Sequence, residues 1–403
     1  MTYPRLPMKR LGDIFLGKML QGKPKSSADV AAPYLRAAHV QPQGRLIDVG
    51  VKTMWFSEQE LKLHDLRADD VVIVEGGAGY GRSAVVPEDR PGWGFQNSII
   101  RVRPRCDIAT GRFLSYALQS ALAAGEIEVA CFTATIPHFT ADKVSAFPVP
   151  APPFDTQRAI AAYLDRETAG IDTLIEEQQR LIEMLRERRE ATIRSALLSG
   201  LDAADKRPSG VELLGAIPGH WRMVPTRYLC TITTGSEDSG NATEDGDYPF
   251  YVRGREVLRI NHYSFDGEAV MTPGDGQGGT GKVFHYFKGK FEAHQRVYVF
   301  KDFVDVSGWY FYYFLSTFLR PVALAGSNTV TMESLRRPLL ADFKIAVPPL
   351  DEQRRITAYL DDQSAKIDTL IAEAERFIEL ARERRSALIT AAVTGQIDVR
   401  EVA

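Results

Sequence analysis

FPVPAPPFDTQRAIAAYLDRETAGIDTLIEEQQRLIEMLRERR, residues 147–189, returns later in the chain as FKIAVPPLDEQRRITAYLDDQSAKIDTLIAEAERFIELARERR, residues 343–385. With a constant offset of 196, 25 of the 43 positions are identical, whereas the sequences between the two copies match only loosely. Self-similarity over this length indicates a duplicated structural unit. We therefore predict a tandem chain in which a globular domain and a helical segment alternate twice.

The start and the end of each helical segment carry local signals. Each copy opens with two prolines and an aspartate, at residues 152–155 and 348–351, which is typical of a helix N-terminus. We expect a first helix of about three turns, ending where Asp165 or Thr168 caps a second and longer helix. Gly200 and Gly395 stand where a helix C-terminus favours glycine, so we expect the helical segments to end there.

Apolar residues recur in both segments at the three-and-four spacing of a coiled-coil seam. The predicted seam consists of Ile171, Leu174, Gln178, Leu181, Leu185, Ile367, Leu370, Ala374, Phe377, Ala381 and Leu388. A second apolar column widens each stripe and indicates further protein contacts, at Ile175, Ile182, Ile371 and Ile378. The alternative is that each helix packs only on its own globular domain.

The sequences between the helical segments predict an α+β fold. Short β-branched runs such as DVVIV, SIIRV, RVYVF and FKIAV are separated by glycine-rich turns. An aromatic segment predicts one helix in each globe, at residues 111–125 and 307–320. The predicted fold is therefore two α+β globes alternating with two long helical segments that pair as an antiparallel coiled coil with pseudo-two-fold symmetry, with boundaries at 1–150, 151–205, 206–346 and 347–403.

Composition places the chain among ordinary globular proteins. Its 403 residues, 44% hydrophobic and 25% charged, suffice for two or more cores. The first twenty residues lack the pattern of a signal peptide, and no run of eighteen uncharged apolar residues occurs, so we expect a cytoplasmic protein. Three cysteines, Cys106, Cys131 and Cys230, lie far apart, which predicts buried thiols and no metal site.

Two glycine clusters resemble nucleotide-binding loops but lack essential residues. Residues 276–283 nearly match the phosphate loop G-x-x-x-x-G-K-[ST], yet Val283 stands where a magnesium-binding hydroxyl is needed. The related cluster at 75–82 is followed by a strand, whereas an S-adenosylmethionine fingerprint requires a helix. We interpret both clusters as glycine-rich hairpins, and we expect neither a catalytic centre nor a cofactor bound by this chain.

The net charge of −3 conceals a basic first segment, because residues 1–56 carry nine lysines and arginines against three aspartates. Basic residues interleaved with aromatic ones favour phosphate contact. Matching positions before a strand in the two globes are occupied by Gln96 and Asn97, and by His294 and Gln295. Such residues either form a turn or hydrogen-bond to adenine edges. The candidate DNA-binding residues are Lys18, Lys23, Lys25, Arg36, Lys52, Arg82, Gln96, Asn97, Arg101, Arg253, Arg255, Lys282, His294 and Gln295.

The repeated motif PPxxxQRxIxxYLDxxxxxIDTLI, followed by RERR, resembles the specificity subunits of type I restriction-modification systems. The stretch LLGAIPGHWRMVPTRYL at 213–229 looks like the start of that family's target-recognition domains, and the resemblance covers essentially the whole chain. It implies two target-recognition domains that each read one half of an asymmetric, bipartite DNA site, separated by about one helical turn of DNA. The paired helices would act as a ruler between the half-sites.

The resemblance also implies partners and a non-catalytic role. Two methyltransferase (modification) subunits would dock on the helices, and restriction/translocase subunits would complete the complex, with S-adenosylmethionine, ATP and magnesium bound by those partners. The candidate docking residues are Gln157, Tyr163, Ile171, Leu174, Leu181, Gln353, Tyr359, Ile367, Leu370 and Phe377. The alternatives are a self-contained methyltransferase or nucleotide-binding enzyme, and a coiled-coil adaptor without a DNA role.

Overall fold

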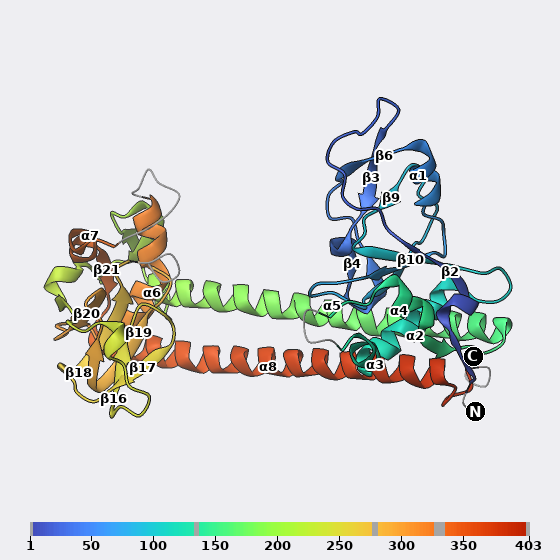
Figure 1. Cartoon of the computed structure of the whole chain (residues 1–403). Coiled ribbons are helices and arrows are strands. Elements are labelled where there is room, and N and C mark those ends of the chain that lie inside the picture. Colours follow the sequence, from blue (N-terminus) through green and yellow to red (C-terminus); the bar gives the residue numbers. More distant parts are fainter. Residues whose placement is uncertain (1–2, 133–136, 276–280, 326–334, 400–403) are drawn as a thin grey trace. The chain divides into compact units, whose positions relative to one another are not determined.

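The computed structural model describes residues 3–132, 137–275, 281–325 and 335–399. These residues form two compact units, the first made of 1–179 with 375–403 and the second of 180–374. Both boundaries fall inside the long helices α5 (Phe154–Ser199) and α8 (Leu350–Thr394), drawn in green and red in Figure 1. Each unit therefore contains one globe, the first half of that globe's own helix and the second half of the other helix, which makes the pairing antiparallel.

Each helical segment is one continuous helix, so the predicted break near Thr168 is wrong. The Thr168 hydroxyl donates to the carbonyl of Leu164 at 2.6 Å, one turn back in the same helix, and Asp165 accepts from Tyr116. Both side chains are thus used in ways that an unbroken helix permits. The predicted ends are confirmed, because the helices begin beside the aspartates and stop before Gly200 and Gly395, whose φ angles are 69° and 76°.

The helices pack through a different apolar column from the main predicted seam. In the first unit Ile175 and Ile378 are buried, and in the second unit Ile182 and Ile371 are buried. The predicted seam residues Leu174, Leu181, Leu370 and Phe377 are instead exposed, whereas Leu185, Ile367 and Ala374 are buried as expected. The column that was expected to meet other proteins therefore closes the helix pair, and part of the expected seam faces outward.

The first globe contains a four-stranded and a three-stranded sheet. The orders are β2-β10-β7-β8 and β6-β3-β9, formed by β2 (Gly12–Leu16), β10 (Ile99–Pro104), β7 (Val71–Val74), β8 (Ser83–Val85), β6 (Thr53–Phe56), β3 (Val30–Leu35) and β9 (Gly94–Phe95). Two small sheets pair β1 (Arg5–Pro7) with β11 (Pro148–Pro150) and β4 (Val40–Gln41) with β5 (Arg45–Leu46). The helices are α1 (Glu58–Leu63), α2 (Gly111–Ala123), α3 (Glu126–Cys131) and α4 (Ala141–Ala146), with 3₁₀ turns η1 (Met8–Arg10), η2 (Ala37–His39) and η3 (Pro42–Gly44).

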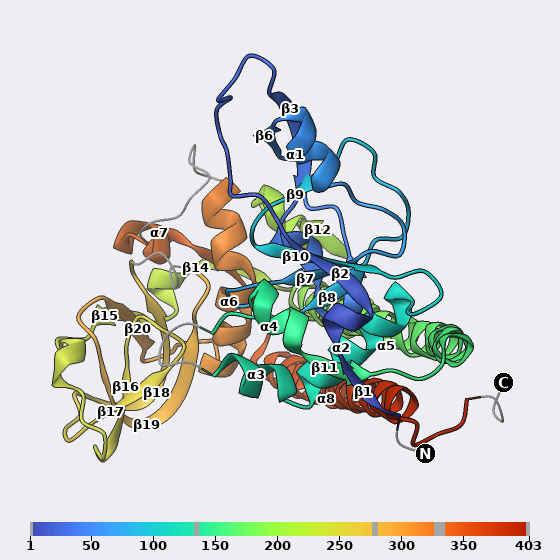
Figure 2. The same ribbon diagram turned by 45° about the vertical axis from the view of Figure 1, so that its right-hand side comes forward.

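The core of the first unit joins its globe to both long helices. The aromatic helix α2 packs against β7, β8, β10 and β11 (Figure 2). Its Ser120 hydroxyl lies 3.0 Å from that of Thr390 in α8. One continuous apolar cluster includes Phe113 of α2, Leu164 of α5 and Val393 of α8. The last described residues also contribute, since Val399 is buried in this cluster.

The second globe is built on a six-stranded sheet. Its order is β15-β20-β18-β19-β16-β17, formed by β15 (Thr231–Thr234), β20 (Val297–Lys301), β18 (Phe265–Pro273), β19 (His285–Ala293), β16 (Tyr248–Tyr251) and β17 (Val257–Ile260). Two small sheets pair β12 (Lys206–Pro208) with β13 (Ala216–Pro218) and β14 (Arg222–Pro225) with β21 (Lys344–Val347). The helices are α6 (Gly308–Ala325) and α7 (Arg337–Asp342), with 3₁₀ turns η4 (Glu212–Leu214), η5 (Thr226–Tyr228) and η6 (Ser239–Asn241).

Both globes close in the same way. The first strand of the β1–β11 pair, like that of β14–β21, runs antiparallel to the strand that directly precedes the long helix. The amide of Met8 donates to the Phe147 carbonyl, and the amide of Thr226 donates to that of Phe343, both at 2.9 Å. The expected aromatic helices also occupy matching places as α2 and α6, so the duplication covers whole units.

The glycine clusters and the cysteines follow the predictions only in part. The cluster at 75–82 is a hairpin, because β7 and β8 pair antiparallel around it. The corresponding loop lies between the antiparallel strands β18 and β19, but residues 276–280 fall outside the described residues. Cys131 and Cys230 are buried as expected, whereas the expectation for Cys106 is wrong, since this thiol is exposed beside Asp107 on a surface turn.

Candidate nucleic-acid and partner interfaces

The glutamine of the repeated PPxxxQR motif fastens each globe to its own helix. Gln157 is buried, donates from Nε2 to the carbonyls of Ile108 and Pro152, both at 2.9 Å, and accepts from the Thr110 amide at 3.3 Å. Every polar atom of this amide is thus used inside the unit. The prediction that Gln157 docks a partner is therefore wrong.

Gln353 makes the same set of contacts in the second unit. It is buried, donates to the carbonyls of Asp305 and Pro348 at 3.0 and 2.9 Å, and accepts from the Ser307 amide at 2.9 Å. Its predicted docking role is wrong for the same reason. Sequence comparison of the repeats alone finds these glutamines, but only the fold shows that they face the loop before the aromatic helix.

The aspartate of the repeated YLD motif binds a tyrosine of the aromatic helix. Tyr116 donates to Asp165 and Tyr313 donates to Asp361, each at 2.7 Å. Burial is the main cause that raises the pKa of Tyr116, to about 12, so its hydroxyl stays protonated and remains a donor. The contact fixes the rotation of α2 and α6 over the long helices.

The repeated IDTLI and RERR motifs meet across the helix pair. Arg385, the last arginine of the second RERR, donates from Nε to Asp172 of the first IDTLI at 2.9 Å. In the second unit Arg189 of the first RERR pairs with Asp368 of the second IDTLI. These ion pairs were not predicted from the sequence, although an antiparallel register that brings one motif onto the other would have indicated them.

Each long helix carries three exposed apolar residues at matching positions. They are Leu174, Leu181 and Met184 on α5, and Leu370, Phe377 and Leu380 on α8, each three equivalent under the offset of 196. Spacings of seven and three place them on one face of their helix. Met184 and Leu380 were missed because they lie outside the predicted seam, although their spacing already pointed to them.

The other predicted docking residues differ in accessibility. Tyr359 is exposed, and Ile171 is partly exposed. Tyr163 and Ile367 are buried within their own units, so their predicted docking role is wrong. Tyr163 lies in the first core cluster.

In the first globe, the predicted DNA contacts divide into exposed and internally engaged residues. Lys23, Lys25 and Lys52 are exposed. Lys18 instead pairs with Glu60, and its ammonium lies 5.2 Å from the centre of the Phe56 ring. Lys18 is therefore held against the globe.

The arginine run 101–105 is structural. Arg101 is buried and donates from Nη1 to the carbonyl of Asp65 at 2.6 Å and to its carboxylate at 2.9 Å. Arg103 binds the buried Asp70 at 2.7 Å. The prediction that Arg101 contacts DNA is therefore wrong, because a strand residue on the inward face reaches a carboxylate that is distant in sequence.

The matching pairs before β10 and β20 serve turns. The Ile99 amide donates to the Gln96 carbonyl, and the Val297 amide donates to the His294 carbonyl, both at 2.8 Å. His294 is buried, and burial lowers its pKa, so the prediction that its ring contacts DNA is wrong. Gln295 is exposed and donates to Asp238 at 3.3 Å, whereas Gln96 and Asn97 are partly exposed.

The remaining candidates in the second globe lie on its surface. Arg253, Arg255 and Lys282 are exposed, and Arg253 lies 3.8 Å from Asp275. Asp275 also binds Arg296 at 2.8 Å, so one carboxylate serves two arginines.

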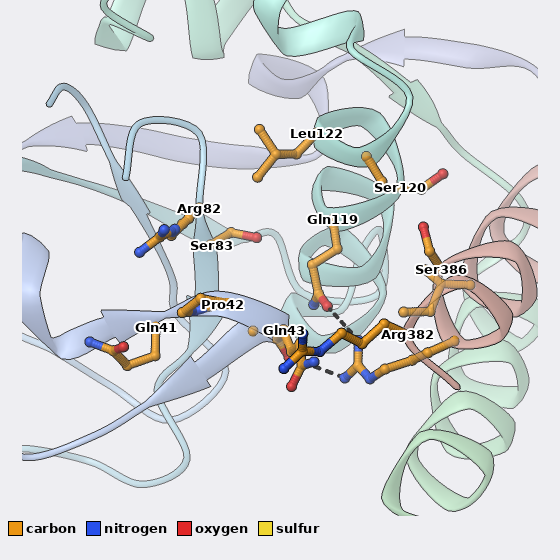
Figure 3. Close-up of a pocket in the computed structure, with 14 residues that line it drawn as sticks. Gln41, Pro42, Gln43, Arg82, Ser83, Gln119, Ser120, Leu122, Arg382 and Ser386 are labelled. Atoms are coloured by element: carbon orange, nitrogen blue, oxygen red, sulfur yellow. Dashed lines mark hydrogen bonds between the residues drawn. The ribbon is translucent and has the colours of Figure 1, made fainter. Parts of the chain in front are cut away.

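A pocket of about 290 Å³ lies in the first unit where the globe meets α8 (Figure 3). Its lining comes from residues 41–44, from the hairpin residues Arg82 and Ser83, from Gln119, Ser120, Leu122 and Ala123 of α2, and from Arg382, Arg385, Ser386 and Ile389 of α8. None of these lining residues is acidic. Arg82 therefore lines a pocket to which α8 also contributes. Arg36, another predicted DNA contact, is partly buried and donates to the Val49 carbonyl at 3.0 Å.

Within the described residues, no group of three or more His, Cys, Asp or Glu side chains is arranged to hold a metal ion. In the same part of the chain, no helix combines the length and apolar character needed to cross a membrane.

The family model of the type I restriction modification DNA specificity domain matches residues 7–184 and again residues 218–377. The chain belongs to this family. The two matches fall on the two halves of the repeat, so the specificity domain occurs twice, and the resemblance of the motifs to type I specificity subunits is confirmed.

Relatives and solved structures agree with this membership. The EcoDI specificity subunit of Escherichia coli is 29% identical over 183 residues, 45% of this chain and 40% of that protein, and the EcoBI specificity subunit of the same organism is 33% identical over 88 residues, 22% and 18% of the two chains. The matched stretches thus span less than half of these curated relatives.

The fold is shared with chains of type I systems over nearly their whole length. One, from a structure of complex assembly and conformational transition of the type I R-M system, aligns with a TM-score of 0.71 at 18% identity over 98% of both chains. The HsdS subunit of Thermoanaerobacter tengcongensis aligns with a TM-score of 0.55 at 16% identity, over 98% of this chain and 97% of that one. The predicted fold class is thereby confirmed.

Proposed function

We propose that this chain is the DNA-reading subunit of a type I restriction-modification complex, in which each globe reads one half of an asymmetric, bipartite target. The observation that carries the proposal is the double match of the specificity domain, one match for each globe-and-helix repeat. The globes differ in their sheets, while the helices are near copies. In this proposal the contrast corresponds to two different half-sites, and a DNA target suits a cytoplasmic protein.

The proposed DNA contacts are the exposed basic residues. In the first globe these are Lys23, Lys25 and Lys52, and in the second globe Arg253, Arg255 and Lys282. Long cationic side chains in solvent can neutralise phosphates and release counterions, which makes affinity fall with salt. Exposed Gln295 can add a base contact through its amide.

The proposed docking surfaces for two methyltransferase subunits are the exposed apolar faces of α5 and α8 with Tyr359. Apolar side chains at identical places in both repeats suit two copies of one partner, because identical surfaces bind identical proteins. S-adenosylmethionine, ATP and magnesium belong to the partner subunits in this proposal, and the restriction/translocase subunits join the assembled complex. This chain itself contributes recognition and no catalytic group.

Methylation mapping tests the proposal. The chain is expressed with methyltransferase subunits of its own system in a host that carries a random DNA library, and methylated positions are sequenced. We expect one interrupted motif with two different halves and a fixed spacer. Methylation by the purified chain alone would favour the self-contained enzyme, and a complex whose DNA affinity ignores sequence and salt would favour the adaptor.

A further inference from the structure

Arg385 ties four elements of the first unit together. Its Nε and Nη2 donate to the two carboxylate oxygens of Asp172 in α5, at 2.9 and 3.2 Å. Its Nη2 also donates to the Gln43 carbonyl at 3.2 Å, and its Nη1 donates to the Gln119 side chain of α2 at 3.4 Å. One guanidinium on α8 thus holds α5, α2 and the loop of η3 at once.

The loop that Arg385 holds is a strained part of the first globe. Gln43 has a φ of 65°, a conformation that non-glycine residues rarely adopt, and Gly44 follows with a φ of 75°. The loop joins the short strands β4 and β5 and lines the pocket together with Gln119 and Arg382, as Figure 3 shows. Such a turn keeps its shape only where its surroundings support it, and the bond from Arg385 to the Gln43 carbonyl is one such support.

Among the residues that the structure describes, the repeat-related arginine of the second unit, Arg189, does not make this set of contacts. The Arg189 side chain is 30% exposed against 7% for Arg385. Arg189 pairs with Asp368, and among the described residues its Nε is buried without a hydrogen-bond partner. Because the helical motifs are the same in both units, the difference lies in the globes.

We infer that Arg385 is a positioning residue that couples the register of the helix pair to the first globe, so that the first half-site is read from a tethered domain. The inference rests on the proposed function for its DNA consequence. Asp172 sets the register of α5 against α8, and the Gln43 and Gln119 contacts transmit that register to the globe. Loosening the tether lets the first globe adjust, which relaxes the spacer length that the complex accepts.

Lysine substitution separates the tether from the ion pair. An ammonium can bind Asp172, but it lacks the planar fork that reaches Asp172, Gln43 and Gln119 together. Arg385→Lys therefore keeps the charge and loses the tether, whereas Arg189→Lys keeps the charge at a site where that network is missing. The two variants are matched by the repeat.

Hydrogen exchange of the full-length isolated chain provides a readout that does not depend on DNA. We expect amides of residues 40–47 to exchange about tenfold faster in Arg385→Lys, because local opening sets the exchange of weakly supported turns. Arg189→Lys should leave these amides unchanged. Equal exchange in wild type and Arg385→Lys would overturn the tether.

Methylation of a library with spacers one base pair shorter and longer provides the functional readout. Arg385→Lys should methylate these spacers several-fold more often, relative to the original spacer, than wild type and Arg189→Lys. If the wild-type complex methylates no bipartite site, the proposed function is wrong. The hydrogen-exchange result would still show whether Arg385 supports the loop at residues 40–47. If both variants keep the wild-type spacer preference, the positioning role is refuted.

A second variant covers the case in which Arg385→Lys does not fold. A Cβ at Gly44 would lie 2.5 Å from the Gln119 amide nitrogen, in a backbone conformation with positive φ. The end of the Gln119 side chain can move aside, but the positive φ of 75° is strained for alanine, so Gly44→Ala destabilises the loop while the Arg385–Asp172 pair remains. It should raise exchange in residues 40–47 and relax the spacer as Arg385→Lys does, and an unchanged loop and spacer would contradict the inference.

Discussion

The two units use the same helical residues to hold different globes. Gln157 and Gln353 make the same three hydrogen bonds. The tyrosine–aspartate bonds of α2 and α6 are shared as well. Beyond these contacts the units differ, because the first relies on Arg385, whereas in the second Glu352 accepts from His220 and from the indole of Trp221. The helix residues that make the shared contacts, the glutamine and the aspartate, are therefore the same in both repeats, whereas the remaining contacts to the globes differ. Such a scaffold can hold target-recognition domains of different sequence.

We expect the largest loss of unfolding free energy when the shared glutamines Gln157 and Gln353 are replaced. Gln157→Leu and Gln353→Leu each leave one buried and two part-buried backbone groups without their partner, so we expect about 3 kcal/mol of lost unfolding free energy for each. Chemical denaturation followed by circular dichroism measures the loss, with the exposed Gln59→Leu as control. A loss at one position only would show that the anchors are not equivalent.

The exposed helix faces should behave alike in the two repeats. Leu174→Glu and Leu370→Glu place a charge on matching surfaces, and we expect each to weaken binding of one methyltransferase subunit about 30-fold. Analytical ultracentrifugation of the assembled complex should show the loss of one partner copy for each variant. Gln179→Glu, an exposed charge control on α5, should leave both copies bound.

The Trp221 contact belongs to the second unit alone. Trp221→Phe keeps the ring buried and removes the donor to Glu352, so we expect about 1.5 kcal/mol of destabilisation. Exchange should rise at the start of α8 and remain unchanged in residues 40–47. Trp93→Phe in the first globe serves as control, and an effect there of similar size would argue against a local contact.

The smallest effect concerns acid stability of the first globe. His64 is buried among Phe15, Phe56 and Phe95, and burial is the main cause that lowers its pKa from 6.5, with Arg101 and Lys18 lowering it further. Glu60, through its carbonyl and its charge, acts in the opposite direction.

Because the unfolded chain binds the proton first, the contribution of His64 is fully present above pH 6.5 and is lost as pH falls towards the folded-state pKa. His64→Phe should therefore reduce the loss of stability between pH 7.5 and 5.5, as measured by urea denaturation at each pH. An identical pH slope in wild type and variant would contradict the assignment.

The fold was largely predictable because its boundaries depend on local chemistry. The proline entries, the aspartates and Gly200 and Gly395 act on the nearest turn of backbone, so sequence suffices to place the helix ends. Which apolar column closes the helix pair was not predictable. Leu174 and Ile175 are adjacent and both apolar, and only the partner helix decides which of them is covered.

The candidate interface was less predictable than the fold, since accessibility depends on distant residues. Arg101 belongs to a basic run that suits phosphate contact, yet Asp65, 36 residues away, takes its guanidinium. The exposed residues Lys23, Lys25 and Lys52 lie in loops. Because loops run over the protein surface, the accessibility of a loop residue is easier to predict from sequence.

The division of the units inside the helices has a consequence for synthesis. The second unit is a continuous stretch, residues 180–374, and is complete while the last part of α8 is still being translated. Translation of the first unit starts before that of the second, but its core lacks Ile389, Ala392, Val393 and Val399 until residues 389–399 emerge. On the ribosome, the domain that begins first therefore finishes last, and its unfinished apolar surface is the part of the nascent chain that chaperones would need to cover.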